Sequence, residues 1–88
     1  MKTSRQLERY FKGAANHRRL DILKVVHKNK KMTLFDIAEK LGCNFKTISG
    51  HTDKLVRAGL LDKSHFGRSV VHALSPYGER FIAFMKKF

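Results

Sequence analysis

The segment from Met32 to Leu61, MTLFDIAEKLGCNFKTISGHTDKLVRAGLL, constrains the fold more than any other part of this chain. Its first half predicts a short helix. Thr33 can act as the N-cap, with Asp36 three residues later as in a capping box. Apolar residues then recur at the spacing of one helical face, at Leu34, Ile37, Ala38 and Leu41. Gly42 is placed to end this helix.

The second half of the segment predicts another helix. Asn44 can cap its start, and Ile48 and Leu55 give it a buried face. Thr52 lies between these two residues, and Gly59 stands where a left-handed residue closes a helix. Two short helices joined by a tight glycine turn form the layout of a helix-turn-helix, whose second helix reads DNA.

The charge of the chain points to a polyanionic partner. Its 88 residues include 19 Lys and Arg against 7 Asp and Glu, a formal net charge of +12. Such a surface attracts phosphates over a Debye length of about 8 Å in physiological salt. Nucleic acid is the first candidate and an anionic membrane the second. We expect a single domain over residues 1–88, small enough to gain from dimerisation.

Several function classes lack their sequence signals. No apolar run approaches the roughly 20 residues that span a bilayer, and residues 1–12 lack the apolar region of a secretion signal, so we expect a cytoplasmic protein. The single cysteine, Cys43, excludes an internal disulfide and a Cys-rich zinc site. No phosphate-binding glycine loop or supported nucleophile is present. We expect neither an enzyme nor a bound cofactor.

The flanking segments predict further elements. Thr3 and Gln6 offer a capping box for a first helix that Gly13 ends or bends, and Asn16 caps a second helix over about 17–28. After the helix-turn-helix, residues 60–65 and 68–74 are extended runs separated by Phe66 and Gly67, which predicts a hairpin. Ser75 and Pro76 then begin a last helix. Its aromatic stripe is Tyr77, Phe81, Phe84 and Phe88.

This order of elements resembles a winged-helix domain, and residues 11–74 resemble the ArsR-type transcriptional repressors. The resemblance is carried by the segment 14–23 (AANHRRLDIL), Asp36-Ile37-Ala38, Leu41-Gly42, Ile48-Ser49, His51, Leu55 and Ala58-Gly59-Leu60-Leu61. The junction 74–78 (LSPYG) is also similar to the start of the last helix in MarR-type and archaeal winged-helix regulators. The resemblance implies a mainly α fold with a small β-hairpin wing, in the order α-α-α-α-β-β-α.

The chain departs from the family at two places. Metal-sensing members have a Cys-x-Cys pair where this chain has Thr33 and Phe35, and the last helix offers only Glu79 as a ligand, so we expect no metal site. Thr52 stands where the family usually has a buried leucine. Its hydroxyl then needs a partner, for which the backbone carbonyl one turn earlier is a candidate.

The resemblance implies that the helix after Asn44 enters the major groove of DNA, with the hairpin as a wing on the adjacent backbone or minor groove. The residues predicted to contact DNA are Asn44, Phe45, Lys46, Thr47, Ser49, Gly50, Lys54 and Arg57 on the helix, and Lys63, His65 and Arg68 on the wing. Asp53 either accepts from a cytosine or pairs with Lys54 or Arg57. Arg18, Arg19, Lys28, Lys30 and Lys31 are candidates to extend the phosphate contacts.

Two further groups have a structural and a functional interpretation. His72 shares a strand face with Val70 and Leu74, which favours a buried, hydrogen-bonded histidine over a ligand. The apolar stripes of the first and last helices need a covering surface, either each other or a second copy of the chain. We favour a symmetric dimer through Leu7, Tyr10, Phe11, Tyr77, Phe81, Phe84 and Phe88.

These features favour a sequence-specific regulator of transcription that binds double-stranded DNA, with repression by promoter occupancy. A dimer would place two recognition helices about 34 Å apart on a pseudo-palindromic site. The alternative is a winged-helix module that binds RNA or a protein partner through the same basic surface.

Overall fold

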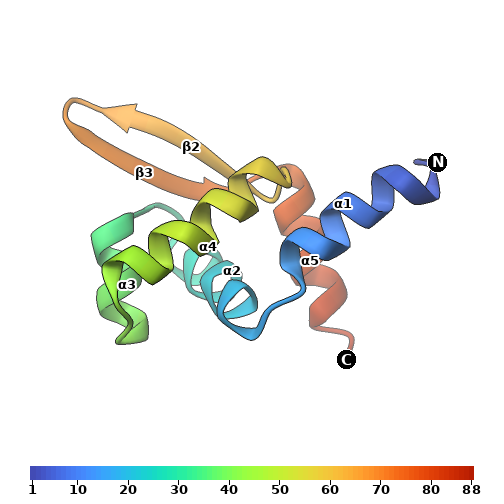
Figure 1. Ribbon diagram of the computed structural model, residues 1–88, viewed down its shortest axis with the longest axis horizontal. Coiled ribbons are helices and arrows are strands. Elements are labelled where there is room, and N and C mark those ends of the chain that lie inside the picture. The colour runs from blue at the N-terminus through green and yellow to red at the C-terminus, as the bar shows by residue number, and fades with distance from the viewer.

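The computed structural model describes residues 1–88 and has five helices and three strands (Figure 1). In chain order these are α1 (Ser4–Ala14), α2 (His17–Asn29), β1 (Met32–Thr33), α3 (Leu34–Leu41), α4 (Phe45–Arg57), β2 (Leu61–Phe66), β3 (Ser69–Leu74) and α5 (Pro76–Met85). This is the mainly helical winged helix-turn-helix fold that the sequence predicts.

The helices begin where their capping residues predict. The Thr3 side chain accepts a hydrogen bond from the Gln6 amide, and the Gln6 side chain accepts one from the Thr3 amide. Thr33 and Asp36 form the same box at the start of α3. Asn16, Asn44 and Ser75 cap the other three helices. Each cap satisfies amides that have no partner inside the helix.

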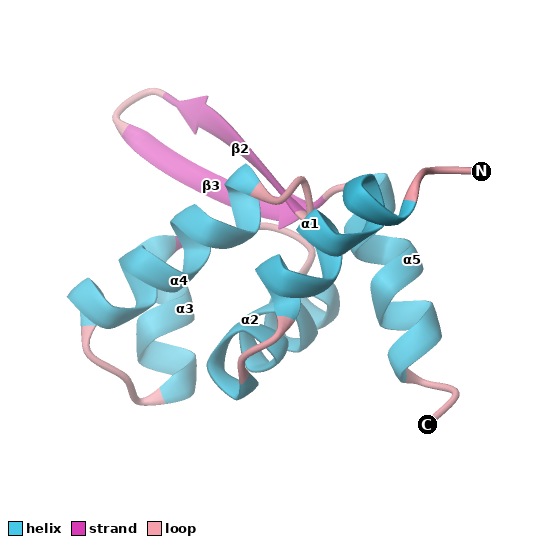
Figure 2. Ribbon diagram, turned by 45° about the vertical axis from the view of Figure 1, so that its right-hand side comes forward, coloured by secondary structure: helices cyan, strands magenta, loops and turns pink.

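The core lies between α2, α3 and α4, which cluster below the sheet in Figure 2. The residues that are buried without any exposed surface include Ile22, Leu23, Val26, Ile37, Ile48, Leu55 and Leu60. All of them except Leu60, which lies between α4 and β2, come from the apolar faces that the helical spacing predicts. Ile82 brings α5 into the same cluster.

The sheet contains one strand that the sequence analysis missed. Residues Met32–Thr33 form β1, which pairs antiparallel with β3 and gives the strand order β1-β3-β2. Strands β2 and β3 form the hairpin, here called the wing, which projects beyond the helices (Figure 1). A two-residue strand has no alternation to reveal it, because its only signal is the pairing with a distant segment.

The wing turn differs by one residue from the prediction. Phe66 pairs with Ser69, so the turn residues are Gly67 and Arg68, where Phe66 and Gly67 were expected. Gly67 has φ +58°, and Arg68 has no positive φ. A positive φ at the first central position alone is typical of a type II′ turn, and glycine adopts it without steric cost.

The ends of two helices also differ from expectation. Gly13 does not end α1, which runs on to Ala14; it is the position where α1 packs against Ala58. Helix α5 ends at Met85, so Phe88 lies outside the helix and completes no helical stripe. Its ring still packs on Phe84, with the ring centroids 5.1 Å apart.

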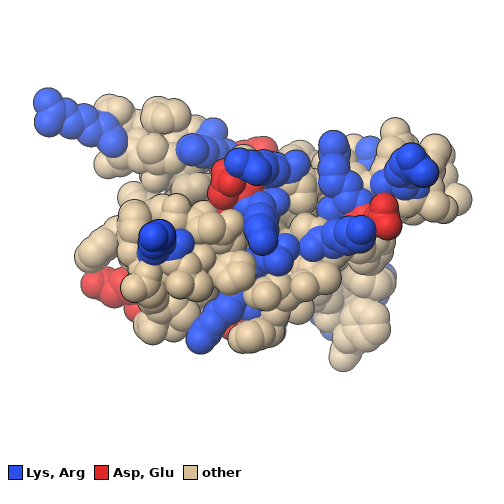
Figure 3. Space-filling model, viewed as in Figure 1, with Lys and Arg blue, Asp and Glu red and all other residues tan.

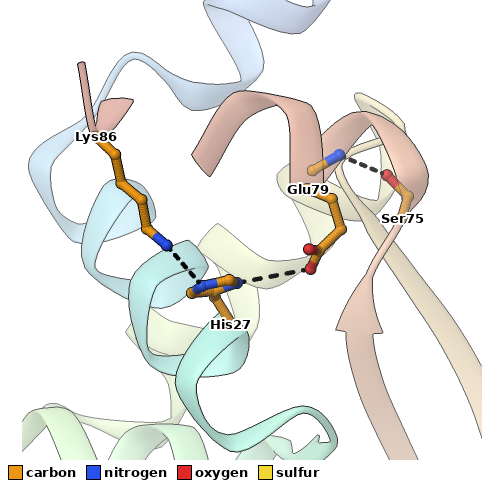
Figure 4. Close-up of polar contacts among 5 residues, drawn as sticks. His27, Ser75, Glu79 and Lys86 are labelled. Carbon is orange, nitrogen blue, oxygen red and sulfur yellow. Dashed lines mark hydrogen bonds and ion pairs between the residues drawn. The ribbon is translucent and has the colours of Figure 1, made fainter. Parts of the chain in front are cut away.

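Polar contacts join α5 to its neighbours (Figure 4). The Ser75 hydroxyl donates to the Gly59 carbonyl at 2.6 Å and accepts from the Gly78 amide at 3.0 Å. His27 of α2 lies between Glu79, at 3.6 Å from its Nδ1, and Lys86, at 3.3 Å from its Nε2. These contacts fix the start of α5 to the end of α4 and its side to α2. None of the helices has the length and apolar character needed to cross a membrane.

Candidate nucleic-acid interface

The start of α4 presents an exposed edge to solvent. The Asn44 side chain accepts hydrogen bonds from the amides of Lys46, at 2.8 Å, and Thr47, at 3.3 Å, so its oxygen serves as the helix cap. Phe45 is 53% exposed, and Lys46 and Thr47 are exposed as well. A large apolar ring left in water beside a cation is suited to contact with bases and phosphates.

The two faces of α4 match the predicted helical rotation. Ile48, Thr52 and Leu55 are buried. The Thr52 hydroxyl donates to the Ile48 carbonyl, so it has the partner one turn earlier that was anticipated. On the opposite face, Asp53 pairs with Arg57 at 3.1 Å. This is the predicted alternative in which Asp53 forms an ion pair on the surface of the helix.

The end of α4 sets the direction of the wing. Gly59 has φ +84°, and the amides of Gly59 and Leu60 donate back to the carbonyls of Val56 and Leu55. This is a Schellman motif, which closes the last turn and redirects the chain. Because β2 begins at Leu61, immediately after this turn, the wing runs back beside α4.

A hollow of about 340 Å³ separates α4 from the wing. Ser49, Gly50 and Asp53 line it from α4, and Lys63 and His72 line it from the wing. Lys63 and His72 are cross-strand partners, so they share the face of the sheet that looks toward α4. The structure therefore brings the predicted helix residues Ser49 and Gly50 and the predicted wing residue Lys63 to one surface.

The tip of the wing carries His65 and Arg68, both exposed, as a contact surface requires. It also carries Phe66, which the sequence analysis treated only as a turn residue. Phe66 is 61% exposed, and the Lys31 ammonium lies 5.2 Å from its ring centroid. The aromatic residue within the predicted turn was the available sequence signal for this position.

His72 is only 5% exposed, as predicted, but its Nδ1 has no hydrogen-bond partner. Burial lowers the pKa of His72, and the Lys63 ammonium lowers it further, against a smaller opposing effect of a hydrogen bond with the Met32 backbone. The expectation of a fully hydrogen-bonded histidine is therefore wrong for one nitrogen. Both burial and Lys63 favour the neutral imidazole at this position beside the hollow.

Positive charge dominates the face that carries α4. Figure 3 shows Lys and Arg side chains gathered over α4 and α1 and at the tip of the wing, with few carboxylates between them. The cations predicted as candidates for extra phosphate contacts do not all lie on one surface. Arg19 lines a hollow with α1 and α4, whereas Lys28 lines a groove between α2 and α5.

The aromatic residues predicted to form a dimer interface meet within the chain. Tyr10 and Tyr77 have ring centroids 5.1 Å apart, and Phe11 and Phe81 have theirs 5.6 Å apart. A groove of about 470 Å³ remains open between α1 and α5, and it is lined by Leu7, Tyr10, Phe11, Tyr77, Phe81 and Phe84 among others. The two stripes thus cover each other only in part, and Phe84 stays 47% exposed.

Nowhere do three His, Cys, Asp or Glu side chains lie close enough together to hold a metal ion. Cys43 is partly buried in the turn before α4, and its thiol donates to the Leu41 carbonyl at 3.3 Å.

Comparison with known families and structures places this architecture. The family described as HVO_A0114 matches residues 14–80 of the chain. No curated protein has a significantly similar sequence.

Solved winged-helix structures are similar over nearly the whole chain. HlyU from Vibrio cholerae N16961 is 24% identical, with a TM-score of 0.86 over 98% of this chain and 94% of that one. HlyU from Vibrio vulnificus CMCP6, a transcriptional regulator, is 26% identical, with a TM-score of 0.80 over 96% and 88%. Fragment 1–100 of Mb0332 from Mycobacterium bovis is 25% identical, with a TM-score of 0.84 over 98% and 85%. That fragment is described as a homodimeric winged helix-turn-helix DNA-binding domain and a possible ArsR-family transcriptional regulator.

Proposed function

The chain belongs to the HVO_A0114 family, and from that premise we propose that it is a sequence-specific, double-stranded-DNA-binding transcriptional regulator that represses by occupying promoters. The observation that carries this proposal is the pairing of an exposed helix start with a basic wing. Ser49 and Gly50 of α4 line one hollow with Lys63 of the wing, and Lys46 is exposed at the start of α4, on a chain of net charge +12. A regulator in the similar solved structures, Mb0332, is described as a DNA-binding domain.

The recognition helix in this proposal is α4. Its first turn enters the major groove, where Lys46 can reach the acceptors of guanine, and Thr47 and Ser49 can contact bases or phosphates. Gly50 leaves open space on the same face, because nothing lies within 4 Å of where a side chain would begin. Asp53 is held by Arg57, which shields nearby phosphates from its charge.

The wing contributes the second contact. Lys63, His65 and Arg68 are exposed along β2 and the turn, so they can lie on the adjacent backbone or enter the minor groove. Phe66 adds an apolar ring at the same tip. Phosphate contacts of this kind position the protein, whereas the start of α4 reads the sequence.

The regulator acts as a homodimer in this proposal. The open groove between α1 and α5 exposes rings that a second copy would bury, and Mb0332 is described as homodimeric. Two copies related by a two-fold axis place their α4 helices about 34 Å apart, which matches one turn of DNA. We expect the protein to lie in the cytoplasm, where such a regulator meets its DNA.

The deciding experiment is the selection of bound sequences from a random duplex pool at about physiological salt, where non-specific binding weakens and specific binding survives. We expect a two-fold-related motif with half-sites one turn apart. Absence of any enriched motif would contradict the proposal and favour a module that binds RNA or a protein.

A charge reversal connects the selection to α4. Lys46→Glu should abolish binding to the selected duplex. Lys24→Glu is the matched control, because Lys24 is exposed in the groove between α2 and α5 and the net charge changes equally. Equal binding by the two variants would remove α4 from the interface.

A further inference from the structure

A second basic surface lies beyond the recognition helix. Five cations line a hollow of about 310 Å³ between α1, the start of α2 and the second half of α4, and we call this surface the basic cradle: Arg9, Lys12, Arg19, Lys54 and Arg57. It lies within the blue band that crosses α4 and α1 in Figure 3. Arg9 and Lys12 belong to a helix that the sequence analysis assigned to dimerisation alone.

Close packing of two helices assembles the cradle. A side chain at Gly13 would overlap Ala58, so α1 can approach the end of α4 only because residue 13 is glycine. Arg19 then reaches the end of α1 and donates from Nη1 to the carbonyls of Lys12, at 3.2 Å, and Gly13, at 2.8 Å. Its guanidinium is therefore held in place before any ligand binds, which lowers the entropic cost of binding.

The charge in the cradle is not neutralised within the chain. Only two of the five cations have a carboxylate partner: Lys12 lies 3.5 Å from Glu8, and Arg57 lies 3.1 Å from Asp53. Five positive and two negative charges leave an excess of three. Burial is the largest cause of the lowered pKa of the neighbouring His51, and the charges of Arg19, Lys54, Arg18 and His17 lower it further.

The length of α4 and the open shape of the basic cradle indicate which anion the cradle binds. From Lys46 to Arg57, α4 rises about 16 Å at about 1.5 Å per residue. The major groove is about 12 Å wide, so a helix that inserts its first turn carries its far end past the groove wall to the sugar-phosphate backbone. The cradle is an open surface on three elements, and the side chains of Arg9, Lys54 and Arg57 are exposed. An open surface with several cations can contact successive phosphates of a nucleic-acid backbone.

We propose that the basic cradle binds backbone phosphates of the same duplex whose groove receives α4, on the strand beyond the groove wall. This inference rests on the proposed function. Arginine can hold a phosphate through two parallel hydrogen bonds, and lysine adds a mobile point charge. The DNA contact of each protomer then includes α1, a helix that also borders the groove between α1 and α5.

The test removes charge from the cradle without touching the start of α4. Arg9→Gln combined with Lys12→Gln removes two exposed cations from α1 and keeps good helix-forming residues. Lys24→Gln combined with Lys86→Gln removes the same charge from the groove between α2 and α5. Fluorescence anisotropy then gives the affinity of wild type and both variants for a selected and a scrambled duplex between about 0.1 and 0.3 M salt.

We expect the cradle variant to lose about three- to eightfold in affinity for each phosphate contact removed, equally on both duplexes. The log-log salt slope should become shallower by about 0.9 per contact, and the control should keep the wild-type slope. Ethylation of phosphates outside the groove should weaken wild type and leave the cradle variant unaffected. If the cradle variant had the same affinity and salt slope as the control, the inference would be overturned. Binding of the duplex by wild type would still support the proposed function. A wild type that binds no duplex would overturn both.

Discussion

Gly13 of α1 lies so close to Ala58 at the end of α4 that a methyl group on Gly13 would overlap the Ala58 side chain. Helix propensity alone predicts that Gly13→Ala stabilises α1 by about 1 kcal/mol. We expect the opposite, a loss of about 1–3 kcal/mol, because the two backbones must separate. The control is Gly50→Ala, which meets no atom within 4 Å and should gain about 0.5–1 kcal/mol. Urea denaturation measures both, and a stabilised Gly13→Ala would contradict the close packing.

Ser75 connects three parts of the chain. Its hydroxyl donates to Gly59 and accepts from Gly78, and its amide donates to the Leu60 carbonyl at 3.2 Å. Ser75→Ala leaves the Gly59 carbonyl and the Gly78 amide without this partner, so we expect a loss of about 1–3 kcal/mol in the free energy of unfolding. Ser64→Ala, on the exposed part of β2, should change it by less than about 0.5 kcal/mol. Equal losses for the two variants would show that the Ser75 hydroxyl has no such role.

The pH dependence of stability should report His72. Burial lowers its pKa in the folded chain below the unfolded value of about 6.5. The unfolded chain therefore binds more protons as the pH falls through 6.5 toward the folded pKa, and the folded state loses stability in that window. His51 has a pKa lowered in the same direction and adds to the loss.

His72→Gln should remove the His72 part of this loss, which chemical denaturation at pH 7.5 and about pH 5 would detect. The comparison variant is His65→Gln, at the exposed end of β2, which should keep the wild-type dependence. If His72→Gln kept the wild-type pH dependence, the folded wild-type chain would accommodate the His72 imidazole in both protonation states.

The proposed dimer depends on Phe84. This ring is 47% exposed at the groove between α1 and α5, so Phe84→Glu should leave the fold intact and place a charge in the interface. We expect sedimentation at micromolar concentration to show a dimer for wild type and a monomer for the variant. Phe35→Glu, which changes an exposed ring at the start of α3, should stay dimeric. A monomeric wild type would contradict the dimer directly.

The local part of this fold could be read from the sequence because its signals are local. Thr3, Asn16, Thr33, Asn44 and Ser75 start their helices as predicted, since a cap acts within three residues of itself. The buried face of α4 followed from its helical spacing, and so did the need of Thr52 for a carbonyl partner.

The remaining features depend on distant pairs. Strand β1 exists because Met32 and Thr33 meet His72 and Val71, and no pattern within two residues shows this. Gly13 was interpreted as a helix end or bend, because its contact with Ala58 is tertiary and leaves no local signal. Arg9 and Lys12 were missed as candidate contacts for the same reason, since Arg9 and Arg57 come together only after α1 packs on α4.

The two-residue strand β1 also limits how the wing can move. It fastens β3 to the connection between α2 and α3, while the Gly59 turn fastens β2 to α4, so the wing is anchored on both sides of the helix-turn-helix. If β3 shifted by one residue in the sheet, its side chains would change faces and His72 would turn outward. Such a shift is therefore energetically costly. The angle between wing and helix is therefore set during folding. We expect the groove of a bound duplex to widen, narrow or bend to this fixed angle, so that flexible base steps would favour binding even where no side chain touches them.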